Sequence, residues 1–106
     1  MVLEGFKVVI TAVAEKDLLS ILTYISETLH EPASASRIYG SIREAVMDLD
    51  HMPMRFQVVE DERFAKEGVR KLLVENYMVF YNVDEAARRV HVLRILYNRR
   101  EWQNLL

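Results

Sequence analysis

The chain contains no cysteine, only three glycines and two prolines, and no apolar run long enough to cross a bilayer. Without cysteine, a disulfide framework and any thiolate metal site are excluded. The N-terminal stretch carries Glu4 and Lys7 among its apolar residues, and it lacks the pattern of a cleaved signal peptide. We therefore expect a cytoplasmic protein with no membrane partner.

Hydrophobic residues make up 51% of the 106 positions, which is enough for a packed core, and we expect one domain spanning residues 1–106.

Charge is distributed unevenly along the chain. Residues 1–85 hold nine Lys and Arg against fifteen Asp and Glu, whereas residues 86–106 hold five Arg against one Glu. A basic end on an acidic body suits an anionic partner such as nucleic acid, although a solvated strand edge accounts for it equally well.

The first half of the chain predicts a strand followed by two helices. Residues 4–11 are rich in aromatic and β-branched residues, as in a strand, and Thr11 can cap a helix over residues 12–29. Pro32 cannot continue that helix but suits the first turn of another. The second helix has an apolar face made by Ile38, Ile42, Val46 and Leu49. The short connection predicts an antiparallel helical hairpin.

The second half predicts a loop over residues 54–68, with room for one short strand, and then three strands. These strands cover residues 69–74, 77–83 and 88–97, and residues 98–106 can form a short helix that uses Trp102 as an apolar contact. The resulting order is β-α-α-β-β-β with a short C-terminal helix. We expect an α+β domain in which the helical hairpin packs on a mostly antiparallel sheet.

The familiar catalytic motifs are absent from the sequence, including the phosphate-binding glycine loop, His-Glu-x-x-His and Gly-x-Ser-x-Gly. The three histidines, His30, His51 and His91, do not have metal-ligand spacing. We therefore expect neither a metal site nor a cofactor.

A set of basic and aromatic residues gathers around the last strands: Arg70, Lys71, Tyr77, Tyr81, His91, Arg94, Tyr97, Arg99, Arg100 and Trp102. Such a set could cleave RNA without a metal, because arginines stabilise charge on the phosphate while histidine or tyrosine carries a proton. A structural role competes with this interpretation. The two tyrosines Tyr77 and Tyr81 fit a sheet or core, and His91 fits a half-buried strand position.

Arg94 interrupts an apolar row. In a regular strand it would share one face with Val90, Val92 and Leu96, while the other face would hold His91, Leu93, Ile95 and Tyr97. An arginine in such a row must reach solvent, pair with a carboxylate, or face a polar site.

The order and spacing of several segments resemble the RelE/ParE superfamily, the toxins of bacterial type II toxin–antitoxin modules of the plasmid-stabilisation type. The segments that carry the resemblance are Ala14, Asp17-Leu18, Ile21 and Tyr24-Ile25, then Pro32 with residues 37–49 and Pro53, then residues 68–70, 76–81 and 92–102. The resemblance implies a cognate antitoxin as partner.

Two activities are implied by the resemblance. RelE-like members cut mRNA on the ribosome without a metal, whereas ParE-like members poison DNA gyrase and are not nucleases. We favour mRNA cleavage, because the C-terminal basic residues offer a phosphate clamp. Its implied catalytic residues are Arg94, Tyr97, His91 and Arg99, and its implied substrate-binding residues are Arg70, Lys71 and Arg100.

Gyrase poisoning remains the alternative. Met78 stands where ribonuclease members often have arginine, Tyr97 stands where many have histidine, and the body of the chain is acidic. A third interpretation is a non-toxic module of the same fold that binds an antitoxin.

Overall fold

Four strands form one sheet in the order β1-β4-β3-β2 in the computed structural model, which describes residues 5–98 and 102–106. The strands are β1 (Lys7–Ile10), β2 (Arg70–Val74), β3 (Tyr77–Asp84) and β4 (Arg89–Tyr97). β1 runs parallel to β4, and the two other pairings are antiparallel. The expected α+β class with a mostly antiparallel sheet is confirmed.

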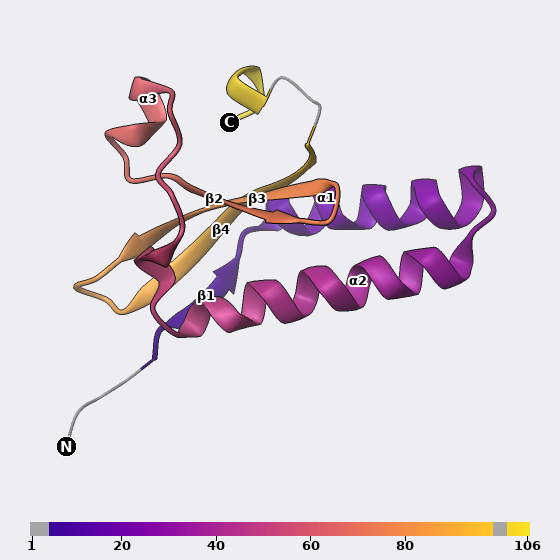
Figure 1. Cartoon of the computed structure of the whole chain (residues 1–106), viewed down its shortest axis with the longest axis horizontal. Helices are drawn as coiled ribbons and strands as arrows, with labels where there is room; N and C mark the ends of the chain where they lie inside the picture. Colours follow the sequence, from indigo (N-terminus) through magenta and orange to yellow (C-terminus); the bar gives the residue numbers. More distant parts are fainter. Residues whose placement is uncertain (1–4, 99–101) are drawn as a thin grey trace.

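Two long helices cover one face of this sheet. They are α1 (Ala12–Thr23) and α2 (Pro32–Met47), and they run antiparallel, side by side, with their far ends extending beyond the sheet (Figure 1). Thr11 caps α1 as predicted, because its side chain accepts a hydrogen bond from the Ala14 amide. The helix expected over residues 12–29 changes character at its end, where η1 (Tyr24–Thr28) is a π-helical turn.

The main core lies between the two helices and the sheet. It contains Ala14, Ile25, Ala35, Ile38, Ile42, Val46 and Leu49 from the helical layer, and Leu72, Val74, Val79, Tyr81, Val90, Val92 and Ile95 from the sheet. Four of the helical residues, Ile38, Ile42, Val46 and Leu49, recur at the spacing of one helix face, which is why the sequence predicts them.

The expected alternation along β4 is wrong in its second half, and a β-bulge is the reason. Tyr81 pairs with Val92 while Phe80 pairs with Arg94, so Leu93 is an extra residue in β4. Beyond the bulge the faces exchange: Ile95 joins Val92 in the main core. Leu93 and Leu96 pack on the opposite face of the sheet.

Residues 48–68 hold more regular structure than the sequence predicted, which was a loop over residues 54–68 with room for one short strand. They form the short helical turns η2 (Asp48–Asp50), η3 (Pro53–Arg55) and α3 (Glu62–Ala65). The stretch between η3 and α3 pairs with the outer edge of β2 through an antiparallel bridge between Val58 and Arg70, which matches the room left for a short strand.

A second, smaller core lies on the sheet face opposite the helices, where α3 and the C-terminal turn η4 (Trp102–Asn104) are found (Figure 1). Its buried residues are Val59, Val69, Phe80 and Leu96, and Phe64, Met78, Leu93, Trp102, Leu105 and Leu106 pack against them. The ring centroids of Trp102 and Phe80 lie 4.9 Å apart. Among the described residues, no helix has the length and apolar character needed to span a membrane.

Candidate functional site

Arg94 pairs with a carboxylate. The sequence had left three possibilities open for this side chain: solvent, a carboxylate or a polar site. Its Nε and Nη2 atoms donate to Asp17 at 2.7 and 2.9 Å, and its Nη1 atom donates to the carbonyl of Leu105. The hydrogen bonds to Asp17 raise the pKa of Arg94 above its ordinary value. Two of the three guanidinium nitrogens are thus bound to a carboxylate and the third to the backbone.

Asp17 reaches β4 because β1 is shorter than β4. β1 pairs with β4 only as far as Val92, which leaves the outer edge of β4 open beyond that point. The start of α1 closes this edge: the Thr11 hydroxyl donates to the Leu93 carbonyl, and Asp17 accepts a hydrogen bond from the Ile95 amide at 3.0 Å. Side chains thereby replace the missing strand partner.

Arg70 and Lys71 lie on opposite faces of β2. The Arg70 Nη1 atom donates to the backbone carbonyls of Met54 and Phe56, at 3.1 and 2.6 Å, and so holds the chain after η3. Lys71 lies on the other face, beside a depression of about 360 Å³ that Phe56 also lines. Phe80 pairs with Lys71 on one side and Arg94 on the other, so the backbones of Lys71 and Arg94 lie about 10 Å apart across the sheet.

His91 and Tyr97 lie at opposite ends of β4. The strand rises by about 3.3 Å per residue, which puts their backbones about 20 Å apart. Arg99 and Arg100, the remaining members of the expected catalytic and substrate-binding set, lie outside the described residues. Of the described members, His91 and Tyr97 are too far apart to act on one scissile phosphate, and Arg94 and Arg70 are already bound to groups of the chain itself.

Three tyrosines gather at the end of the sheet where β4 stops. The ring centroids of Tyr77 and Tyr97 lie 5.8 Å apart in an edge-on arrangement. Burial raises the pKa of Tyr77, and nearby Tyr97, Glu75 and Tyr24 raise it further. We call Tyr24, Tyr77 and Tyr97 the tyrosine cluster. Tyr24 is 55% exposed and Tyr97 is 40% exposed, so the cluster leaves aromatic surface open to solvent.

Tyr24 was not among the site residues expected from the sequence. The sequence pattern places Tyr24 near the end of the first helix, 53 residues before Tyr77, and gives no sign that the two side chains meet. It joins the cluster from η1, and π-helical turns occur frequently at functional sites. Next to the cluster, Arg37 of α2 holds both carboxylate oxygens of Glu75, at 2.7 and 2.8 Å.

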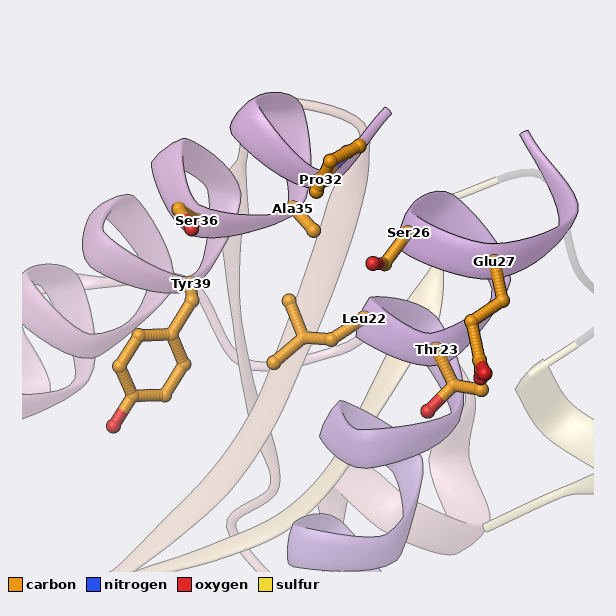
Figure 2. A pocket seen from close by; sticks show the side chains of 8 residues that line it. All are labelled: Leu22, Thr23, Ser26, Glu27, Pro32, Ala35, Ser36 and Tyr39. Carbon is orange, nitrogen blue, oxygen red and sulfur yellow. The ribbon is translucent and has the colours of Figure 1, made fainter. Parts of the chain in front are cut away.

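A groove of about 600 Å³ lies between the end of α1, with η1, and the start of α2 (Figure 2). Leu22, Thr23, Ser26 and Glu27 line it from α1 and η1, and Pro32, Ala35, Ser36 and Tyr39 line it from α2. In Figure 2, Leu22 points toward α2 between the two helices, with Ala35 facing it. The residues that line this groove could not be read from the sequence, because its walls come from two helices whose relative placement is a tertiary property.

In residues 5–98 and 102–106, no three His, Cys, Asp or Glu side chains are grouped closely enough to hold a metal ion.

Two of the solved structures that share this architecture are described as toxin–antitoxin systems. The chain matches one described as the chromosomal ParDE system from P. aeruginosa with a TM-score of 0.73, at 23% identity, over 88% of this chain and 96% of that one. It matches the RelBE2 toxin–antitoxin complex from Mycobacterium tuberculosis with a TM-score of 0.63, at 20% identity, over 91% of this chain and 94% of that one. These likenesses show a shared fold. No curated protein sequence matches the chain.

The family match over residues 8–102, together with this shared fold, places the chain among the toxins of the RelE/ParE superfamily. Within it, residues 8–102 match the family described as the ParE toxin of the type II toxin–antitoxin system, parDE, and the chain belongs to this family.

Proposed function

We propose that this toxin inhibits growth by binding DNA gyrase in the ParE-like manner, through a surface that includes the tyrosine cluster, and that it does so in the cytoplasm under the control of a cognate antitoxin. One observation carries the proposal. Arg94, which a nuclease would need for its phosphate clamp, is bound to Asp17, whereas Tyr24 and Tyr97 at the end of the sheet are exposed.

Cleavage of RNA without a metal needs a phosphate clamp and proton carriers within hydrogen-bond reach of the same substrate atoms. Arg94 is bound to Asp17, Arg70 is bound to two backbone carbonyls, and His91 lies about 20 Å along the strand from Tyr97. Binding to a protein target requires none of this convergence. Exposed tyrosines are typical of the residues that contribute most to protein–protein affinity.

Ribosome-dependent mRNA cleavage is the second candidate, and one feature favours it. Tyr97 is exposed at the end of β4, and Arg99 and Arg100 follow it directly in the sequence. A clamp built from Tyr97 and these two arginines would not use Arg94 or His91.

The deciding experiment is a short pulse of induced expression in which DNA synthesis, protein synthesis and the 5′ ends of a reporter mRNA are followed together. Gyrase poisoning predicts that DNA synthesis falls first while the message stays intact. It also predicts that the purified chain increases the amount of plasmid DNA cleaved by purified gyrase. Coexpression of the antitoxin encoded beside the toxin gene should prevent both effects.

New mRNA 5′ ends that precede any loss of DNA synthesis, and that vanish in Tyr97→Phe, would contradict the gyrase proposal and support the nuclease. A normal growth rate with retained antitoxin binding would identify the third possibility, a non-toxic module of the same fold.

A further inference from the structure

Arg94 joins three parts of the fold: α1, β4 and residues 102–106, which comprise η4 with the two leucines after it and are called the C-terminal turn below. Nε and Nη2 bind the two carboxylate oxygens of Asp17 at 2.7 and 2.9 Å, and Nη1 binds the carbonyl of Leu105. A guanidinium is planar and presents its donors in a fixed fork, so the two bonds to Asp17 also fix the direction of the third. Asp17 therefore sets the bond that Arg94 makes to the C-terminal turn.

The C-terminal turn covers apolar surface on the second face of the sheet. The Trp102 ring lies 4.9 Å from the Phe80 ring and 6.1 Å from the Phe64 ring, measured between centroids. Phe80 has no exposed surface, and Leu105 and Leu106 pack in the same cluster. Removal of the turn would expose the Phe80 side chain, which belongs to a residue type usually found buried.

The attachment of this turn is separable from the main core. Among the described residues, none of residues 102–106 belongs to the core that α1 and α2 form with the sheet. Segments that rest on a small satellite cluster open at a lower free energy than the whole fold. A local opening can therefore leave the helices and the sheet intact.

We propose that Asp17 and Arg94 form a latch that keeps residues 102–106 closed over the second face of the sheet, and that loss of the latch opens this turn while the rest of the fold persists. Asp17 is a positioning residue that acts through Arg94. It lies 77 positions before Arg94 in the sequence, so the latch links the first helix to the end of the chain.

Trp102 is the sole tryptophan and sits on the segment that would move, so its fluorescence reports directly on opening. In the purified full-length chain, we expect Asp17→Asn to shift Trp102 emission to longer wavelength and to raise its acrylamide quenching constant at least twofold. Binding of an apolar dye should increase as Phe80 becomes exposed. The far-UV circular dichroism spectrum should stay unchanged. Asp48→Asn is the matched control, because it removes the carboxylate partner of Arg55 without touching residues 102–106.

Arg94→Lys provides a second test, because a lysine keeps the charge but cannot hold Asp17 and the Leu105 carbonyl in one rigid fork. Deletion of Leu105 and Leu106 provides a third test, because it removes the Leu105 carbonyl that accepts the hydrogen bond from Arg94. In that shortened chain Asp17→Asn should raise quenching no further.

Two results would overturn the latch. One is quenching of Trp102 in Asp17→Asn and Arg94→Lys that equals the wild-type and Asp48→Asn values. The other is loss of the circular dichroism spectrum in both variants, because the proposal requires the helices and the sheet to survive the opening.

Discussion

The hydroxyl of Tyr81 donates a hydrogen bond of 2.5 Å to the carbonyl of Pro53, 28 positions earlier in the sequence. Tyr81 lies in the middle of β3 and has no exposed surface, and Pro53 begins η3. The bond therefore attaches the segment after the second helix to the centre of the sheet, where no regular pairing could reach it.

We expect Tyr81→Phe to lower the free energy of unfolding at pH 7 by about 1–2 kcal/mol, because the ring still packs while the Pro53 carbonyl loses its buried donor. Chemical denaturation of the two proteins measures this difference. Tyr39→Phe, at an exposed tyrosine, is the control and should leave the unfolding midpoint unchanged.

The same pair of proteins should respond differently to alkaline pH. Burial raises the pKa of Tyr81 to about 12, whereas an unfolded chain loses the proton at about pH 10. Above pH 10 the unfolded state is therefore stabilised by deprotonation and the folded state is not, so this contribution to stability is lost as the pH rises toward 12. The advantage of the wild type over Tyr81→Phe should shrink across this window, by about 1 kcal/mol per pH unit at most. A constant difference from pH 8 to pH 11.5 would contradict this cause.

Thr11 joins two elements with one hydroxyl, which caps α1 at the Ala14 amide and donates to the Leu93 carbonyl at the β-bulge. We expect Thr11→Val to cost about 1–2 kcal/mol of unfolding free energy, because both bonds disappear while the side-chain volume is kept. Thr11→Ser should recover most of the loss. Equal destabilisation by valine and serine would show that the methyl group, and not the hydroxyl, is responsible.

The two carboxylate–arginine pairs Asp17–Arg94 and Glu75–Arg37 should differ in their effect on stability. The side chains of Asp17 and Arg94 are 12% and 21% exposed, and Asp17 also accepts the Ile95 amide. We expect Asp17→Asn to cost about 2–3 kcal/mol, because it weakens charge-assisted bonds away from water. Glu75→Gln at the exposed pair should leave the unfolding midpoint almost unchanged. Thermal unfolding of both variants would reveal the contrast, and similar losses would argue against burial as the cause.

The tyrosine cluster should be required for toxicity. We expect Tyr97→Ala and Tyr24→Ala each to reduce growth inhibition at least tenfold in viable counts, because both remove exposed aromatic surface from a contact with the target. Tyr39→Ala removes a tyrosine of similar exposure, 43% against 40% for Tyr97, from the groove between the helices. It should keep full toxicity. Circular dichroism and antitoxin binding check that the folds are intact, and an equal loss in all three variants would remove the cluster from the proposal.

Several features could be read from local sequence signals. The apolar face that contains Ile38, Ile42 and Val46 has helical spacing, and these residues do pack in the core. Thr11 stands where a helix cap is needed, and it caps α1. The turn at Glu75 and Asn76 separates two β-rich segments that do pair. These signals suffice because a helix face, a cap and a hairpin depend on residues close together in the sequence.

The candidate site could be predicted only in part. The sequence singled out Arg94 and Tyr97 but could not assign them partners. Arg94 meets Asp17 because β1 ends early and leaves an open edge that α1 closes. Tyr97 meets Tyr77 in the pairing of β3 with β4, and Tyr24 joins them through a π-helical turn.

The sequence by itself determined the α+β class and the helical hairpin, because these follow from periodicity, caps and the order of segments. Its resemblance to a toxin superfamily became membership of a family through the match over residues 8–102. The tertiary structure decided which described arginines bind a carboxylate or a backbone carbonyl, and which tyrosines share a surface. It also decided which face each residue of β4 occupies, because a single extra residue at Leu93 exchanges the two faces of that strand. Strand register, bulges and contacts between distant segments depend on the energy of the whole packed arrangement, which no local pattern contains.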